Sequence, residues 1–490
     1  MGDTPRHEPA ATGPLTEVHV SPLPPERFRE VVGERWPEVR EAIDVARGLF
    51  AGRVIWHVNS TARGGGVAEL LQSLIAYARG AGVDNRWIVI EGDPEFFAVT
   101  KRIHNFLHGS KGDGGELGPS QREIYEAVTN RSAEALARRV RPGDIVFLHD
   151  PQTAGMTKTL RETGAHVVWR CHVGVDTPNE LAKRGWDFVR PYAQEADSYV
   201  FSRREFAWER LHDRKVWIVA PSIDAFSPKN QELEPATVDA ILATAGLWDR
   251  HGESPALFTR VDGSPGRVDS VAEVDEDAPI PADVPVLTQV SRWDRLKDPA
   301  GVLRCFAEHC GVPELHLLLG GPATEAVSDD PEGADVLEEV RELRAGLGPA
   351  VRARVHLACL PMHDIEENAA IVNAVQRRST VVMQKSIAEG FGLTVAEAMW
   401  KRRPVVATRC GGIQDQINGE SGILVDDPHD LAGFGAAVEG LVADPTHAEA
   451  IGGTARERVR EHFLGTRHLI QYMRLLAELI DGPPGSRMVM

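Results

Sequence analysis

The chain alternates short apolar runs with amphipathic stretches over most of its length. In the first half, residues 67–82 have apolar positions at helical spacing and end in Gly80 and Gly82, which suit a helix C-cap. The other apolar runs are continuous rather than alternating, which is typical of parallel strands covered on both faces. The strands predicted in this half are 52–60, 86–92, 144–150, 166–173, 198–206 and 216–224.

A second series of the same kind follows residue 283, and it ends in an amphipathic helix over 462–480. The sequence therefore predicts an α/β fold of two doubly wound, Rossmann-like domains. In such a pair we expect a ligand cleft between the domains, at the carboxyl ends of both sheets. The strands predicted in this half are 284–294, 315–322, 353–360, 380–386, 404–412 and 422–427.

The segment between the two series, 245–283, is rich in Gly, Pro, Asp and Ser and shows little periodicity. We interpret it as an interdomain connection with an inserted loop. Its Asp275-Glu276-Asp277 string has a spacing found in metal sites, but the acidic, low-complexity setting favours a solvated charge run. The expected division is an N-terminal extension that is partly flexible (1–45), a first domain (46–235), a linker with the inserted loop (236–283), a second domain (284–460) and a C-terminal helix crossing back to the first domain (461–490).

Composition and charge limit the binding partners and the cellular location that we expect for the protein. The net charge of −18 argues against a nucleic-acid or anionic-membrane partner, because such a surface needs a basic face. No apolar run approaches the roughly 20 residues that span a bilayer, and the N-terminus lacks the apolar core of a secretory signal. Five cysteines without paired or zinc spacing fit reduced thiols in a cytoplasm. We expect a cytoplasmic protein acting on small molecules, with a homodimer as one open alternative.

Gly64-Gly65-Gly66 is the first of three features at predicted strand ends. These glycines follow the strand at 52–60 and precede a helix, so backbone N–H groups there could approach a phosphate closely. A tight turn without a ligand is the alternative, because the spacing matches no phosphate-loop fingerprint.

The second feature is the stretch SRWDRLKD (291–298), which follows the first strand of the second half. Arg292 and Lys297 supply two cations in an acidic protein, and such a pair could neutralise a diphosphate. The alternative is a surface pair that Asp294 and Asp298 neutralise.

The third feature is AEGFGLTVAEAMW (388–400), which raises the question whether it is a helix start or a site. As a helix start, Thr394 and Glu397 have the spacing of a capping box, and Glu389 is a solvated carboxylate. As a site, the backbone N–H groups of the turn hold phosphate oxygens, and the two carboxylates accept hydrogen bonds from sugar hydroxyls. The turn comprises Gly390, Phe391, Gly392 and Leu393.

These motifs resemble those of a known family of enzymes. Residues 389–397, EGFGLTVAE, resemble the E-x7-E signature of retaining family-4 glycosyltransferases, and SRWDRLKD resembles that family's Arg-and-Lys donor-phosphate motif. In the first half, HVNSTARGGGVAELLQSL, RWIVIEGDPEFFAVTKRIHNFLHG, FLHDPQTAG and WRCHVGVDTPN resemble the trehalose synthase group and its trehalose phosphorylase cousins. The resemblance covers residues 50–230 and 284–480.

The resemblance implies the GT-B architecture, with two Rossmann-like domains facing across a cleft. Residues 46–235 are then the acceptor domain and 284–460 the donor-nucleotide domain. It also implies a role for each matching residue: His172 near the hydroxyls of the reacting sugar, Arg292 and Lys297 on the donor diphosphate, Glu389 on the donor sugar, Glu397 on the nucleotide ribose, and Asp150 and Gln152 on the acceptor. His57 and His149 have no such match and are interpreted as structural, and Cys171 as a buried apolar residue.

The activity implied is retaining transfer of glucose from a nucleoside-diphosphate glucose (ADP, UDP or GDP) to glucose. The product is trehalose or a closely related disaccharide, and no metal or other cofactor is required because the two cations stabilise the leaving diphosphate. Two alternatives stay open: a phosphorylase that cleaves trehalose with inorganic phosphate, and a catalytically silent module that binds a sugar nucleotide. The complete set of matching residues argues against the silent module.

Overall fold

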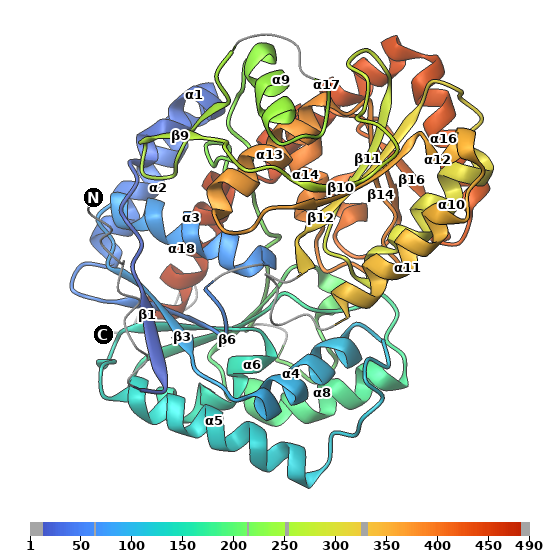
Figure 1. Cartoon of the computed structure of the whole chain (residues 1–490). Helices are drawn as coiled ribbons and strands as arrows, with labels where there is room; N and C mark the ends of the chain where they lie inside the picture. Colours follow the sequence, from blue (N-terminus) through green and yellow to red (C-terminus); the bar gives the residue numbers. More distant parts are fainter. Residues whose placement is uncertain (1–12, 63–64, 213–214, 250–253, 325–331, 482–490) are drawn as a thin grey trace, which may run out of the picture. The chain divides into compact units, whose positions relative to one another are not determined.

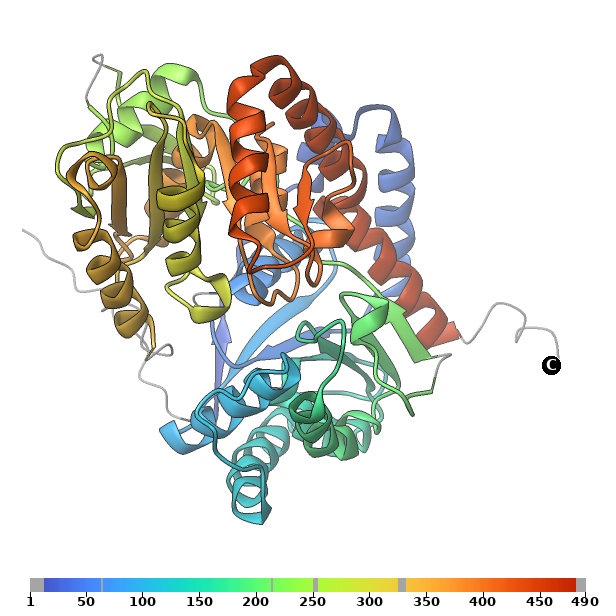
Figure 2. The same ribbon diagram turned by 90° about the vertical axis from the view of Figure 1, so that its right-hand side faces the viewer.

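The computed structural model describes residues 13–62, 65–212, 215–249, 254–324 and 332–481. The chain forms two compact units (Figures 1 and 2). Unit 1 contains the residues up to Arg27, Glu34–Val219 and the segment from Leu469 on; unit 2 contains Phe28–Gly33 and Ala220–His468. Each unit is built on one seven-stranded sheet covered by helices, which confirms the predicted α/β fold of two Rossmann-like domains.

The sheet of unit 1 has the strand order β1-β3-β2-β4-β5-β6-β7. Strands β2 to β7 run parallel, and β1 pairs antiparallel with β3 at one edge. Both faces are buried, which explains why the strands read as continuous apolar runs. The strands are β1 (Leu15–Val18), β2 (Ile55–Asn59), β3 (Asn85–Ile90), β4 (Ile145–His149), β5 (His166–Cys171), β6 (Ser198–Phe201) and β7 (Val216–Ile218).

The two faces of this sheet carry different helices (Figure 1). Helices α4, α5 and α8 cover one face, and α3 and the C-terminal helix α18 contribute to the core on the other. Tyr472 and Leu476 of α18 pack there with Phe147 and Val168. The helices are α2 (Trp36–Leu49), α3 (Gly65–Gly80), α4 (Pro94–Leu107), α5 (Pro119–Ala137), α6 (Asp150–Thr153), α7 (Thr157–Arg161), α8 (Glu180–Ala193) and α18 (Gly465–Asp481), with the 3₁₀ turns η1 (Pro25–Phe28), η2 (Gly33–Arg35), η3 (Ala154–Met156) and η4 (Arg204–Phe206).

The sheet of unit 2 has the order β10-β13-β12-β11-β14-β15-β16, again parallel except for its edge strand β10. A separate two-stranded sheet pairs β8 with β9. The strands are β8 (Leu257–Thr259), β9 (Pro265–Arg267), β10 (Glu273–Asp275), β11 (Val286–Val290), β12 (His316–Pro322), β13 (Val355–Leu360), β14 (Val381–Gln384), β15 (Val405–Thr408) and β16 (Ile423–Val425).

Helices α10, α11 and α16 cover one face of this sheet, and α9, α13, α14 and α17 lie on the other (Figure 1). No helix in the described ranges is long and apolar enough to cross a membrane. The helices are α1 (Arg29–Val32), α9 (Pro235–Thr244), α10 (Pro299–His309), α11 (Gly333–Ala345), α12 (Pro349–Arg352), α13 (Ile365–Arg378), α14 (Leu393–Trp400), α15 (Ile413–Gln416), α16 (Leu431–Ala443) and α17 (Pro445–His462), with the turn η6 (Arg295–Lys297).

Each sheet has a switch point, where the chain order of neighbouring strands reverses. In unit 1 it lies between β2 and β4, because β3 pairs on the other side of β2. In unit 2 it lies between β11 and β14. Loops leave the two central strands in opposite directions there, which opens a crevice at their carboxyl ends. Residues just after these strands are therefore placed to form a site in each unit.

The segment 236–283 is more ordered than the sequence suggested. It contains α9, the β8–β9 pair and β10, which joins the edge of the unit 2 sheet next to β13. The prediction of a solvated charge run at 275–277 is right only for Asp277, which is exposed; Asp275 and Glu276 are partly buried, and each of the three carboxylates meets a basic group of a neighbouring element. The contacts are Asp275–Arg341 at 2.8 Å, Glu276–His356 at 2.6 Å and Asp277–Arg344 at 2.9 Å.

Candidate active site

The turn after β11 holds the first predicted cation. Asp294 caps this turn: its carboxylate accepts from the backbone N–H of Leu296 at 2.7 Å. The same carboxylate lies 3.2 Å from the guanidinium of Arg292. The Arg292 side chain is 41% exposed, and its ion pair with Asp294 orients it. The predicted alternative, a pair between Arg292 and Asp294, is present in the structure.

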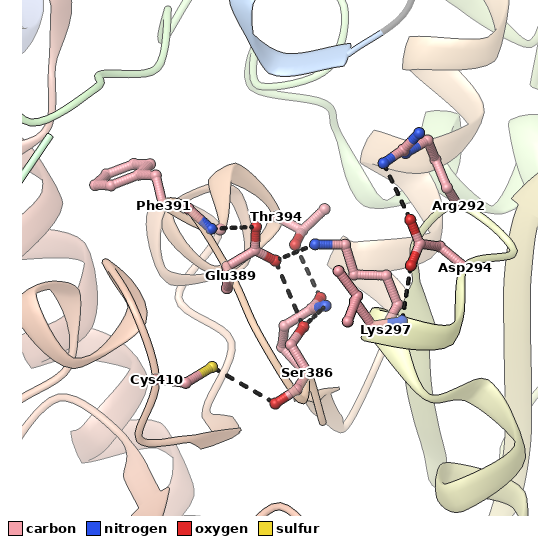
Figure 3. Close-up of polar contacts among 12 residues, drawn as sticks. Arg292, Asp294, Lys297, Ser386, Glu389, Phe391, Thr394 and Cys410 are labelled. Carbon is pink, nitrogen blue, oxygen red and sulfur yellow. Dashed lines mark hydrogen bonds and ion pairs between the residues drawn. The ribbon is translucent and has the colours of Figure 1, made fainter. Parts of the chain in front are cut away.

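The second cation contacts a predicted site residue instead of its sequence neighbour. Lys297 Nζ lies 2.6 Å from Glu389 Oε2, and Figure 3 shows the two side chains pointing toward each other. The alternative in which Asp298 neutralises Lys297 is wrong. Asp298 caps α10 by accepting from Gly301 N at 2.9 Å, and its second oxygen pairs with the buried Lys385.

Hydrogen bonds between the loops after β11 and β14 fix this arrangement. The side chain of Gln289 donates to the carbonyl of Lys297 and accepts from the backbone N–H of Lys385, both at 2.9 Å. The N–H of Ile387 donates to the carbonyl of Leu296 at 2.8 Å. Because Gln289 is buried in β11, these bonds hold both loops against the end of the sheet.

The turn before α14 depends on glycine. Gly392 has φ of 84°, a left-handed conformation that favours glycine, and it is the N-cap of α14. Gly411, in the loop after β15, passes so close to the carbonyl of Glu389 that a Cβ would lie 1.6 Å from that oxygen. The turn is therefore packed tightly, with the N-terminus of α14 at the switch point of unit 2.

The interpretation of Thr394 and Glu397 as a capping box is wrong. No side chain caps α14, and the hydroxyl of Thr394 donates to Gln384 Oε1 at 2.9 Å (Figure 3). Glu397 is 2% exposed, with Lys229 Nζ 3.7 Å from its carboxylate. Burial lowers the pKa of neighbouring Lys401 well below its usual range, and the charge of Glu397 acts in the opposite direction.

In unit 1, His172 follows β5 and is half-buried. Its backbone N–H donates to Asp150 Oδ1 at 2.7 Å, and its ring Nε2 lies 3.3 Å from Nδ1 of His149. Asp150, which follows β4, has a left-handed φ of 63°. Burial raises the pKa of the Asp150 carboxyl to about 7, and the hydrogen bond from His172 opposes that rise. The structure thus brings His172 and Asp150 together at the switch point of unit 1.

The structure shows fewer contacts for the other residues of unit 1 that the sequence singled out. Gln152 lies in α6, and its buried Oε1 has no hydrogen-bond partner among the described residues, so this oxygen could accept from a ligand hydroxyl. Gly65 and Gly66 begin α3, whereas Gly64 lies outside the described residues. The prediction for Cys171 is confirmed, because it is buried in the core and burial raises its pKa.

Sequence reasoning missed Gln289 and Lys385 as organisers of the site. Each acts through hydrogen bonds or ion pairs between loops that are remote in sequence, and no spacing rule marks such residues. Among the described residues, no group of three or more His, Cys, Asp and Glu side chains is arranged to hold a metal ion.

Comparisons with known proteins match both units to families of glycosyltransferases. A family model for the trehalose synthase N-terminal domain matches residues 57–208, and one for group 1 glycosyl transferases matches residues 271–458. The trehalose synthase of Thermococcus litoralis is 37% identical over 92% of this chain and 96% of its own length. That of Rubrobacter xylanophilus is 36% identical over 88% of this chain and 92% of its own.

More distant proteins share part of the sequence or only the fold. A trehalose phosphorylase from Pleurotus pulmonarius is 26% identical over 89% of this chain but only 58% of its own length. The solved structure of an alpha,alpha-trehalose-phosphate synthase (UDP-forming) from Burkholderia vietnamiensis matches with a TM-score of 0.63 at 15% identity, covering 88% of this chain and 98% of its own. A sucrose-phosphate synthase from Thermosynechococcus elongatus gives 0.61 at 18% identity, covering 88% and 100%.

The fold is thus the GT-B fold of glycosyltransferases, and the polar residues of unit 2 lie where such a fold binds ligands. The chain belongs to the trehalose synthase family of glycosyltransferases.

Proposed function

We propose that the chain is a retaining glycosyltransferase that moves glucose from a nucleoside-diphosphate glucose to free glucose. The product is trehalose or a closely related disaccharide. The observation that carries the proposal is the contact between Lys297 and Glu389 at the switch point of unit 2, within a chain similar to trehalose synthases over nearly its full length.

Unit 2 supplies the donor residues in this proposal. Arg292 and Lys297 contact the diphosphate, together with backbone N–H groups from Gly390 to Leu393 at the start of α14. Glu389 contacts the donor sugar and Glu397 the ribose. The ion pair of Lys297 with Glu389 keeps both charges compensated before the donor binds, so a diphosphate would replace one counter-charge of Lys297 with another.

The transfer follows from these charges. The bond between the anomeric carbon and the diphosphate oxygen breaks, and the oxygen leaves with the electron pair. Arg292, Lys297 and the helix N-terminus stabilise the developing negative charge, which is electrostatic catalysis. The acceptor hydroxyl forms its bond to the same face of the sugar, and its proton passes to the departing phosphate. The anomeric configuration is therefore kept.

Unit 1 supplies the sugar-binding residues. His172 contacts hydroxyls of the reacting sugar, and Asp150 and Gln152 contact the acceptor. The buried Oε1 of Gln152 supports this role, because a buried acceptor without a partner among the described residues gains a hydrogen bond from a sugar hydroxyl. Gly65 and Gly66 at the start of α3, with Gly64 before them in the sequence, complete the proposed contacts by binding the donor phosphate.

A phosphorylase reaction is the second candidate, since the chain also resembles a trehalose phosphorylase. In that reaction inorganic phosphate replaces the nucleotide, and Arg292 and Lys297 would bind it. The chain spans 58% of that relative's length, compared with 96% for the first trehalose synthase. We therefore favour the nucleotide-sugar donor.

A product assay decides between the two candidates. Purified protein is given ADP-, UDP- or GDP-glucose with glucose, glucose phosphate or inorganic phosphate, and separately trehalose with phosphate. We expect a disaccharide from at least one nucleotide sugar with glucose, with an α linkage by NMR of the fresh product. Release of glucose phosphate from trehalose alone would favour the phosphorylase, and a β linkage would exclude retention.

A further inference from the structure

Three histidines and one asparagine of unit 1 form a continuous hydrogen-bonded chain that leads from the start of β3 through β2 to the carboxyl ends of β4 and β5. Asn85 Oδ1 lies 3.3 Å from His57 Nε2, and His57 Nδ1 lies 3.1 Å from His149 Nε2. His149 Nδ1 lies 3.3 Å from His172 Nε2. Asn85, His57 and His149 are at most 2% exposed. We call this set the histidine chain; it leads from the core to the residue that we place beside the reacting sugar.

The register of three strands brings the rings together. His57 in β2 pairs with Phe147 in β4, two residues before His149, so their side chains share one face of the sheet. His149 pairs in turn with Arg170, two residues before His172. The rings stack as well: His57 lies 5.0 Å from Phe147 at 13°, and His149 lies 5.6 Å from His172 at 16°.

The two buried rings are neutral. Burial lowers the pKa of His57 to about 3, and the positive charge of Arg170 acts in the same direction, whereas the hydrogen bond to Asn85 opposes it. Burial likewise lowers the pKa of His149 well below its usual range, and neighbouring His57, His172 and Arg170 add to that effect. A neutral imidazole has one N–H donor and one acceptor nitrogen, so the hydrogen bonds of the chain must all run in one direction.

Asn85 sets that direction. Its amide NH₂ donates to the carbonyl of Val83 at 3.4 Å, so its Oδ1 faces His57 and can only accept. His57 therefore carries its proton on Nε2 and accepts on Nδ1 from the Nε2–H of His149. His149 in turn accepts on Nδ1 from the Nε2–H of His172.

We infer that His57 and His149 are positioning residues, which require the proton of His172 on Nε2, where it is donated to His149. A neutral His172 then has Nδ1 as its acceptor nitrogen, so that it presents an acceptor, and not a second donor, to a sugar hydroxyl. That contact rests on the function proposed above, whereas the tautomer rests on the hydrogen-bond geometry and on the burial of the two neutral rings.

The tautomer can be measured directly. The full chain is labelled with ¹⁵N-histidine, and the His172 ring is identified by comparison with His172→Gln. Long-range proton–nitrogen NMR then reports which nitrogen carries the proton. We expect Nε2–H in the wild type, a mixture in His149→Phe, which keeps a ring but offers no acceptor, and restored Nε2–H in His149→Gln, whose amide has one donor and one acceptor. A wild type with Nδ1–H, or an unchanged ring in His149→Phe, would overturn the inference.

A second variant acts from the far end of the chain. Asn85→Leu removes the terminal acceptor, so the direction is no longer fixed and the proton of His172 should shift toward Nδ1. This variant keeps the inference testable should His149→Phe fail to fold. His356→Gln is the matched control, because His356 is an equally buried histidine of unit 2 that is hydrogen-bonded on both nitrogens. It should leave the His172 signals unchanged.

Activity supplies an independent readout. We expect kcat of His149→Phe to fall about tenfold or more, because one oriented hydrogen bond is lost, and His149→Gln to retain most of it. Normal kcat in a folded His149→Phe whose tautomer is mixed would overturn the positioning role, although wild-type transfer would still stand. If instead the wild type transfers glucose from no nucleotide sugar, the proposed function fails while NMR still decides the tautomer.

Discussion

The two switch points use opposite chemistry on similar sheets. At the switch point of unit 2, charged pairs meet: Lys297 with Glu389, and Arg292 with Asp294. At that of unit 1, neutral histidines are linked by hydrogen bonds, and the carboxyl of Asp150 has a raised pKa. One architecture can thus present either fixed charges or oriented neutral groups, and the residues at the carboxyl ends of its central strands decide which.

This contrast between charged and neutral groups matches what the leaving diphosphate and the sugar of a glucosyl transfer each require. A leaving diphosphate gains negative charge in the transition state, so preorganised cations lower the barrier. A sugar has neutral hydroxyls, each of which needs one donor and one acceptor in a fixed place. Substitutions confined to one unit should therefore affect one of these requirements and spare the other.

Removing the Lys297 charge should have the largest effect. We expect Lys297→Ala to lower the transfer rate on the order of a hundredfold or more, because a cation that stabilises the leaving group contributes several kcal/mol. Arg295→Ala is the control: Arg295 lies in the same turn, is 59% exposed and pairs with Glu339. Steady-state kinetics check both variants, and equal rates for the two would refute a donor role for Lys297.

Glu397→Gln should weaken donor binding with a smaller effect. A carboxylate accepts hydrogen bonds from two ribose hydroxyls better than an amide does, so we expect Kd to rise roughly ten- to a hundredfold. Calorimetric titration checks the affinity, with exposed Glu420→Gln as the control. Wild-type affinity in Glu397→Gln would contradict the ribose contact.

The histidine chain should give unit 1 a particular dependence of stability on pH. The pKa of His57 is about 3 in the folded protein and 6.5 in the unfolded chain, so below pH 6.5 the unfolded chain binds more protons. Stability is full above pH 6.5 and declines as the pH falls toward 3. Between pH 7 and 4.5 we expect the wild type to lose about 2 kcal/mol relative to His57→Gln.

Melting curves of the two proteins at both pH values measure this loss. Asp150 has a raised pKa and so acts in the opposite direction, but it is present in both proteins and cancels in the comparison. Parallel changes in melting temperature for the two proteins would contradict a neutral buried His57.

Chelation should have the smallest effect. Because Arg292 and Lys297 stabilise the leaving diphosphate in our proposal, we expect the same rate before and after dialysis against EDTA. The rate is then measured again with added magnesium. Activity that disappears in EDTA and returns with magnesium would show that the two cations do not suffice.

The fold could be read from the sequence because the central strands are buried on both faces. The two antiparallel edge strands were missed: β1 and β10 are four and three residues long and only partly buried, so neither has a continuous apolar run. The segment containing β10 also has the composition of a loop, and its carboxylates find their partners on α11 and β13 only in the folded chain.

Some features of the candidate site could likewise be predicted from the sequence, and others could not. The residue types at Arg292, Lys297, Glu389 and Glu397 stand in short motifs that a sequence can reveal. The contacts of these residues cannot be read from such motifs. Lys297 pairs with Glu389 on a different loop, and Asp298 pairs with Lys385 and not with Lys297. The histidine chain could not be predicted at all, because it depends on the register of β2, β4 and β5 at once.

Nucleoside diphosphate binding tests the contrast between the two units most directly. ADP, UDP and GDP are titrated by calorimetry into the wild type, Lys297→Ala and His149→Phe, and melting curves check that each protein is folded. We predict that at least one diphosphate binds the wild type, that Lys297→Ala weakens this binding about tenfold or more, and that His149→Phe leaves it unchanged. Equal binding to the wild type and Lys297→Ala, or loss of binding in a folded His149→Phe, would contradict the account.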